Sequence, residues 1–191
     1  MAFISKIEGL DWCGEYLLYL ENKQKGVKKE AKKHMDSFFY DFLKQKTESK
    51  RFFIDKVNQI AYDHHDFGKY LPYDLYNKLF KPEIEKWIID ESLNPIPLKW
   101  SYDFELLKKA LMLNPLDQTV LHQLFTMLIA RISMNQHEIK AGFGYEGNPK
   151  NDIEEIDFIM QYIDNILNSE EKNRVKTLID ELRESAVHYL T

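Results

Sequence analysis

Apolar residues recur at steps of three and four along most of the chain, and polar or charged residues separate them. This period is typical of one face of an α-helix and differs from the alternation of a half-buried strand. Trp12, Tyr16 and Leu20 begin the pattern, and Gly26 ends its first run. The pattern predicts five helices in the N-terminal half: 11–24, 27–46, 47–62, 73–80 and 83–92. Pro82 is expected in the first turn of the fifth helix.

The same spacing continues in the C-terminal half. Asn114 and Pro115 close one helix, and a leucine-rich helix follows, so the two should pack as a hairpin. The predicted helices of this half are 104–113, 116–134, 153–167 and 169–190. The fold class is therefore predicted to be all-α, with eight or nine antiparallel helices forming an α-helical bundle.

Composition agrees with a folded helical protein. The 191 residues are 44% hydrophobic and 14% aromatic, which supplies a sizeable core. Seven glycines and six prolines are too few for a many-turned β-sandwich. Pro95 and Pro97 mark the best linker candidate, because each proline disfavours the helical conformation in the residue before it. The chain is expected to be a single all-helical domain, 1–191, with two subdomains, 1–94 and 98–191, as the alternative.

Cysteine usage and hydropathy point to a location. Cys13 is the only cysteine, so an intramolecular disulfide and a cysteine-based zinc site are excluded. The first residues show no signal-peptide pattern, and no stretch has the roughly 18 apolar residues that a membrane span needs. A cytoplasmic protein without a membrane partner is the expectation.

The sequence His65, Asp66, Phe67, Gly68, Lys69 carries the clearest chemical signal. It resembles the HDxGK core of HD-domain phosphohydrolases, helical enzymes in which histidines and aspartates hold a metal that activates water. The resemblance implies His34, His65 and Asp66 as metal ligands, with Lys69 near a phosphate. In the alternative, Asp63 or Asp66 caps a helix end, Gly68 supplies a left-handed turn and the histidines are solvated.

A second resemblance begins at Leu107. Ala110, Leu111 and Leu113 before Pro115, followed by a leucine stripe, resemble the join between two tetratricopeptide repeats. This implies a TPR-like helical hairpin in the C-terminal half. The region is also similar to uncharacterised helical bacterial proteins that combine an LNP-containing turn with a later His-Glu and a glycine-rich loop, a likeness that implies architecture and no activity.

The loop from His137 to Lys150 combines polar, aromatic and glycine residues. Its candidate contact residues are His137, Glu138, Phe143 and Tyr145. Gly142, Gly144 and Gly147 have the spacing of GxGxxG, but a dinucleotide site needs a preceding strand and none is predicted. The glycines are expected to permit tight turns while the aromatic side chains pack on helices or face a partner.

Charge is uneven along the chain, although the formal net charge is only −5. Residues 23–56 carry a local +6 and residues 146–185 a local −6. Glu154 and Glu155 belong to the acidic part and are candidate contacts for a charged protein partner. Both parts also fit the solvated sides of amphipathic helices, and Arg51 is the only arginine of the basic part, so nucleic-acid binding is not expected.

Two hypotheses for function follow. The first is a non-enzymatic helical protein-protein interaction module without a cofactor, one form of which is an immunity protein that binds a cognate toxin. Its candidate binding surface adds His64, His65 and Asp66 to the loop and acidic residues named above. The alternative is a metal-dependent HD-type phosphohydrolase.

Overall fold

The computed structural model describes residues 10–137, 139, 142 and 144–190, and this part of the chain is all-α, as predicted. It contains eight helices of ten residues or more, together with several shorter ones, and no strand. None of its helices combines the length and apolar character needed to cross a membrane. Contacts divide the chain into an N-terminal unit, Met1–Ser101, and a C-terminal unit, Tyr102–Thr191.

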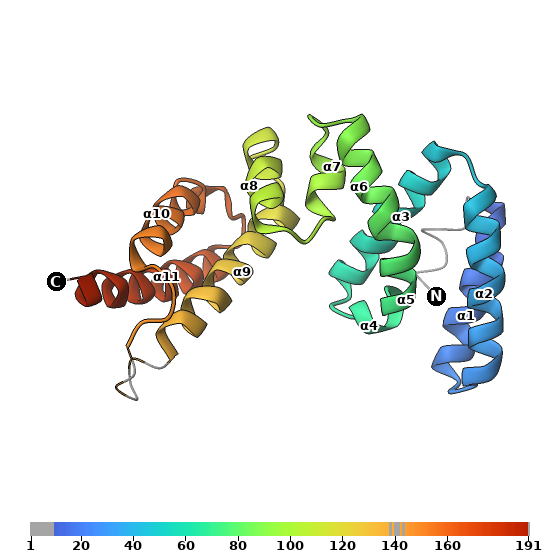
Figure 1. Ribbon diagram of the computed structural model, residues 1–191, viewed down its shortest axis with the longest axis horizontal. Coiled ribbons are helices and arrows are strands. Elements are labelled where there is room, and N and C mark those ends of the chain that lie inside the picture. The colour runs from blue at the N-terminus through green and yellow to red at the C-terminus, as the bar shows by residue number, and fades with distance from the viewer. Residues whose placement is uncertain (1–9, 138, 140–141, 143, 191) are drawn as a thin grey trace. The chain divides into compact units, whose positions relative to one another are not determined.

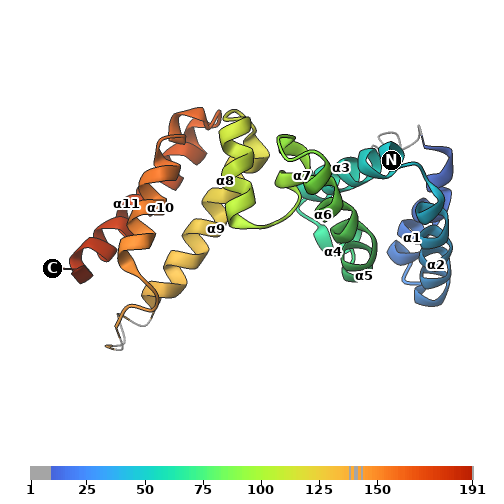
Figure 2. The same cartoon turned by 45° about the horizontal axis from the view of Figure 1, so that its top comes forward.

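The N-terminal unit begins with a short 3-10 turn and two adjacent helices, α1 and α2, which lie side by side in both ribbon views (Figures 1 and 2). Its elements in chain order are η2 (Asp11–Cys13), α1 (Gly14–Gln24), α2 (Lys28–Lys44), α3 (Thr47–Asp63), α4 (Phe67–Tyr70), α5 (Tyr73–Leu75), η3 (Tyr76–Phe80), α6 (Lys81–Asp90) and α7 (Pro95–Lys99). The first three predicted helices are confirmed at nearly the predicted bounds.

Aromatic side chains fill the core of this unit. Tyr16 and Phe38 lie 5.3 Å apart between ring centroids, and Phe38 lies 5.2 Å from Phe53, so α1, α2 and α3 meet at one cluster. Phe42 and Phe80 extend the cluster toward α6. All five rings are almost completely buried, and burial of such large apolar surfaces provides most of the stabilisation that holds these helices together.

The helix break predicted near Pro82 is wrong. Residues 73–90 form one continuous helix, in which Tyr76–Phe80 is a π-helical segment. The Lys81 backbone N–H donates to the carbonyl of Tyr76, five residues earlier. In a regular α-helix the acceptor would be the carbonyl four residues earlier. Proline has no N–H and its ring collides with the carbonyl four residues before it, so widening the preceding turn lets the helix pass through Pro82.

The segment with Pro95 and Pro97 forms helix α7 and packs into the unit. Asn94 caps it by accepting a hydrogen bond from the Ile96 N–H at 3.0 Å, and Pro95 occupies the first helical position, where no N–H is needed. Trp100 is fully buried and its indole N–H donates to Asp55 of α3 at 2.7 Å. The division between the units therefore follows Ser101 and not the prolines.

The C-terminal unit comprises α8 (Phe104–Leu113), α9 (Gln118–Gln136), α10 (Pro149–Met160), η5 (Ile163–Asn165) and α11 (Ser169–Leu190). Helix α9 contacts α8, α10 and α11, and α10 lies beside α11 (Figure 2). Asp103 and Asp117 cap α8 and α9 through their side chains, which fixes where both helices begin.

The helix predicted over 153–167 ends earlier, at Met160. Asn165 donates to the carbonyl of Pro115 at 2.9 Å, and Gln118 bonds the backbone of both Asn165 and Leu167. These contacts with the α8–α9 turn replace a further helical turn. Leu167 is consequently 82% exposed, while Ile166 is buried in its place.

Candidate binding site

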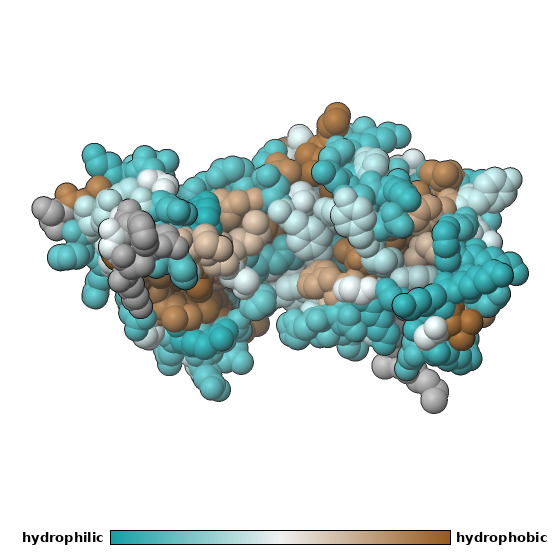
Figure 3. All heavy atoms as spheres, turned by 60° about the horizontal axis from the view of Figure 1, so that its bottom comes forward, coloured by the Kyte–Doolittle hydropathy of each residue, from teal (hydrophilic) through white to brown (hydrophobic). Residues whose placement is uncertain are grey.

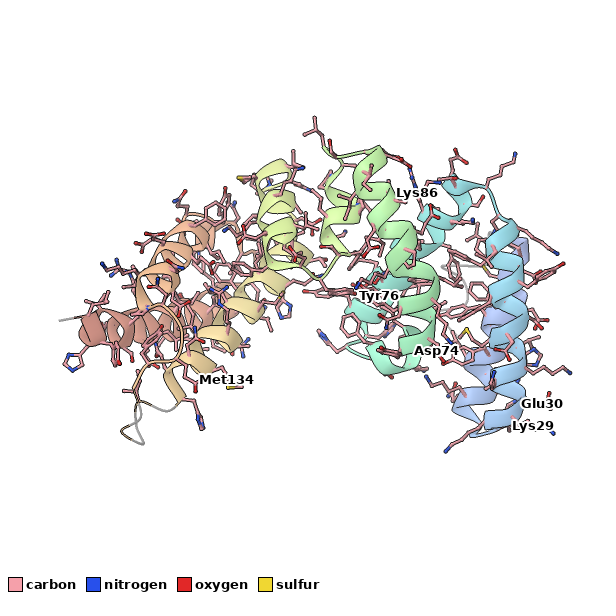
Figure 4. All side chains as sticks on the ribbon, in the orientation of Figure 1. Lys29, Glu30, Asp74, Tyr76, Lys86 and Met134 are labelled. Atoms are coloured by element: carbon pink, nitrogen blue, oxygen red, sulfur yellow. The ribbon has the colours of Figure 1, made fainter. Side chains whose placement is uncertain are left out.

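A groove with a volume of about 580 Å³ opens between α1, α2 and α5 in the N-terminal unit. We call it the α2–α5 groove. The part of the surface formed by this unit in Figure 3 shows apolar side chains surrounded by hydrophilic ones. In Figure 4, Asp74 projects from α5 on the side of α2. The volume is in the range of sites that bind small molecules or peptide side chains.

The floor of the groove is apolar. It is formed by Ala31, Met35, Phe39 and Pro72, with Tyr19 and Tyr73 beside them. Phe39 is half-buried, in contrast to Phe38 and Phe42, which belong to the core. Phe39 lies outside this core because only one face of α2 packs against α1 and α3. Tyr73 is 80% exposed, so its ring offers a free face at the edge of the groove.

The rim is charged. Its charged side chains are Lys23, Lys28, Lys32, Asp36, Asp74 and Lys78. Lys32 pairs with Asp36 at 2.7 Å and Lys78 pairs with Asp74 at 3.0 Å, both in solvent-exposed positions. Lys28 is exposed, and its ammonium has no ion-pair partner in the part of the chain that the structure describes. The rim therefore carries more positive than negative charge.

Lys23 occupies the inner part of the rim. Its Nζ donates to the Tyr19 hydroxyl at 2.8 Å and to the carbonyl of Gly68 at 2.6 Å. Partial burial lowers the pKa of Lys23 from its ordinary value of 10.5, and the nearby Asp66 carboxylate partly offsets that effect. The groove thus adjoins the segment DHHDFGK, residues 63–69, in which α3 ends and α4 begins.

The structure does not bring His34, His65 and Asp66 together as a set of ligands. The Nδ1 of His34 lies 2.8 Å from Glu15, on the neighbouring helix α1. Asp66 caps α4 by accepting from the Lys69 N–H at 3.0 Å, and His65 adopts a left-handed backbone with φ of 50°. Across the described residues, no group of three or more His, Cys, Asp or Glu side chains is arranged to hold a metal ion.

The predicted histidine surface is present as an exposed segment. His64 and His65 are both exposed, and the His64 ring lies 5.6 Å from that of Tyr70. Tyr70 is buried, and its carbonyl accepts a hydrogen bond from the buried Tyr16 hydroxyl at 2.6 Å. That bond joins the end of α4 to α1.

Tyr145, predicted as a contact residue, belongs to a half-buried polar network around the buried Asp152 in the C-terminal unit. Its hydroxyl donates to Asp152 at 2.6 Å, and Asn135 donates to the same carboxylate oxygen at 2.8 Å. Burial, reinforced by the bond to Asp152, raises the pKa of Tyr145 to about 12. Arg131 pairs with Glu155 and lies 3.5 Å from Asp152. This network holds the end of the loop against α9 and α10.

The remaining predicted contacts differ in their surroundings. Glu154 is exposed on α10, whereas Glu155 is half-buried by its pairing with Arg131. His137 is exposed just after α9. Glu138 and Phe143 lie outside the described residues. The GxGxxG spacing follows helix α9 directly, and the described part of the chain has no strand in front of it, so the loop lacks the context of a dinucleotide site.

Two parts of these sites were missed by sequence reasoning. Asp152 is 4% exposed and lies at the centre of the polar network, but its position in an acidic helix gave it no distinguishing signal. The α2–α5 groove was missed because its walls come from segments that are far apart in the sequence. The one available signal was the second apolar stripe of α2, in which Ala31, Met35 and Phe39 recur four residues apart.

Cys13 lies in the interior of the N-terminal unit. Its side chain is almost fully buried, and burial raises the pKa of the thiol to about 12.

Comparison of the chain with known protein families, curated proteins and solved structures gives no match.

Proposed function

We propose that this chain is a non-enzymatic helical protein-binding module, and that its principal contact site is the α2–α5 groove. The observation that carries the proposal is the combination, in one cavity of about 580 Å³, of an apolar floor and a lysine-rich rim. Apolar surface supplies affinity when it leaves water, and the charged rim orients the partner.

The exposure of Tyr73 supports this assignment. Tyr73 is 80% exposed and Phe39 is half-buried. A bound partner would remove both aromatic rings from water. Tyrosine is common at the energetic centres of protein interfaces, because it presents a large, rigid surface with a polar tip.

An immunity protein that inactivates a cognate toxin is one protein class that would need such a surface. The resemblance of α8 and α9 to a tetratricopeptide join is compatible with a binding module as well. The proposed contact site depends only on the residues that line the groove. It requires neither the TPR-like assignment nor the toxin assignment.

The proposal is tested by selecting peptides from a random library displayed on phage against the immobilised chain. We expect enrichment of binders, and we expect Tyr73→Ala to reduce the binding of the enriched pool about tenfold or more. Tyr40→Ala is the matched control, because Tyr40 is also an exposed tyrosine of the N-terminal unit, at 64%, but lies outside the groove.

Absence of enriched binders, or equal losses in the two variants, would contradict the proposal. Circular dichroism establishes that both variants keep the helical fold. Since both tyrosines are exposed, neither substitution removes core packing.

A further inference from the structure

The rim of the α2–α5 groove carries more lysines than aspartates. We infer that the groove binds an acidic polypeptide segment that inserts one large apolar side chain between carboxylates. This inference rests on the proposed function, and it adds the chemical class of the partner.

Charge complementarity is the first argument. The rim carries four lysines against two aspartates. Asp36 and Asp74 already face Lys32 and Lys78 in exposed ion pairs, so an incoming carboxylate meets an excess of ammonium groups. The surrounding segment 23–56 has a local charge of +6, which attracts an acidic chain before contact.

The shape of the lining is the second argument. The groove has a volume of about 580 Å³, its apolar floor includes Met35 and Phe39, and the exposed ring of Tyr73 lines it as well. Transfer of a large apolar side chain onto this floor removes apolar surface of both partners from water. A peptide that carried only acidic residues would leave the floor uncovered.

The distribution of lysines favours a polypeptide over a small anion. Lys23 comes from α1, Lys28 from the start of α2 and Lys78 from the π-helical segment after α5. Because these lining lysines come from three separate elements, carboxylates on either side of an apolar anchor can each meet a lysine. A single small anion would use only part of this rim.

The test compares the peptides that different variants select from the same random display library. For the unmodified chain we expect the enriched sequences to have negative net charge and to contain Trp, Phe, Leu or Ile. The double variant Lys28→Glu and Lys78→Glu should bind the acidic pool about tenfold more weakly and select neutral or basic sequences instead.

Lys29→Glu is the matched control. Lys29 is an exposed lysine of α2 next to Lys28, but it lies on the neighbouring surface of that helix with Lys33 and does not line the groove. We expect it to leave the composition of the enriched pool unchanged. Binding to the unmodified chain should also weaken as salt is raised, because rim charges are exposed to solvent.

Three results would overturn the inference. If the unmodified chain enriched neutral or basic sequences, the protein-binding proposal would be kept and the inference of an acidic partner would be rejected. If the Lys28→Glu and Lys78→Glu double variant enriched the same peptides as the unmodified chain, the rim charge would not determine which peptides bind. Binding of the anionic dye 8-anilinonaphthalene-1-sulfonate in the groove, lost in Tyr73→Ala while no peptide is enriched, would assign the groove to small apolar anions and would remove the protein-binding proposal too.

Discussion

Lys23 donates a hydrogen bond from Nζ to the Gly68 carbonyl oxygen over 2.6 Å, although the two residues are 45 positions apart. The bond connects the end of α1 with α4. It places an ammonium group at the inner rim of the α2–α5 groove and shields it partly from water. Both the position and the protonation of this lysine therefore depend on the folded N-terminal unit.

Lys23 should titrate below 10.5 in the folded chain, because burial disfavours its charged form. The folded state then binds fewer protons at this site than the unfolded state, so the contribution of Lys23 to stability rises as the pH approaches 10.5. NMR of reductively ¹³C-methylated lysines measures the titration, and the resonance lost in Lys23→Arg identifies the residue. A Lys23 resonance that titrates at or above 10.5 would contradict the prediction.

Tyr145→Phe should lower the free energy of unfolding of the C-terminal unit by about 1 kcal/mol, since it removes one hydrogen bond to the buried Asp152 carboxylate. Urea denaturation followed by circular dichroism measures the change. Tyr40→Phe is the control, because Tyr40 is 64% exposed and should change stability by less than about 0.5 kcal/mol. Equal effects of the two substitutions would argue against the network.

The same tyrosine predicts a pH dependence. Its pKa is raised from 10.0 to about 12, so the unfolded state ionises first as the pH rises. The stability that Tyr145 contributes is complete below pH 10 and is lost between pH 10 and about 12. The difference in unfolding free energy between the unmodified chain and Tyr145→Phe should therefore shrink over that interval. A difference that stays constant to pH 12 would contradict the assigned cause.

Gly147→Ala should destabilise the C-terminal unit by about 1–2 kcal/mol. Gly147 has φ of 92°, and an added Cβ would lie 3.0 Å from the side-chain nitrogen of Asn135, which donates to Asp152. Gly68→Ala is the matched control, because its φ is not in the left-handed region and its added Cβ meets nothing within 4 Å. Thermal unfolding of the two variants should separate them clearly, and a stable Gly147→Ala would show that the loop adjusts without cost.

Arg51→Met should destabilise the N-terminal unit by about 2 kcal/mol. Arg51 of α3 is buried, and its guanidinium donates to Asp90 at 2.5 Å and to Glu91 at 2.6 Å near the end of α6. Its removal leaves carboxylates without their cation and weakens the contact between the two helices. Lys56→Met on the same helix is the control, and similar losses in both would contradict a specific role for Arg51.

Helix positions were largely determined by the sequence alone. Apolar steps of three and four fix which face of each helix is buried, and side chains such as Asp103 and Asp117 fix where α8 and α9 begin. Both signals act within a few residues, so they can be read without knowledge of the tertiary contacts. This is why α2, α3 and α8 lie close to their predicted bounds.

Tertiary structure decided what lies between the helices. The continuous helix through Pro82 requires a π-helical turn, and the early end of α10 requires bonds from Gln118 and Asn165 to a distant turn. The sequence marked the apolar stripe of α2, but whether Phe39 enters the core or lines a groove depends on which neighbours pack against it. Burial of Asp152 and the lysine rim likewise arise from segments brought together by folding, because packing of distant surfaces, and not local periodicity, sets their surroundings.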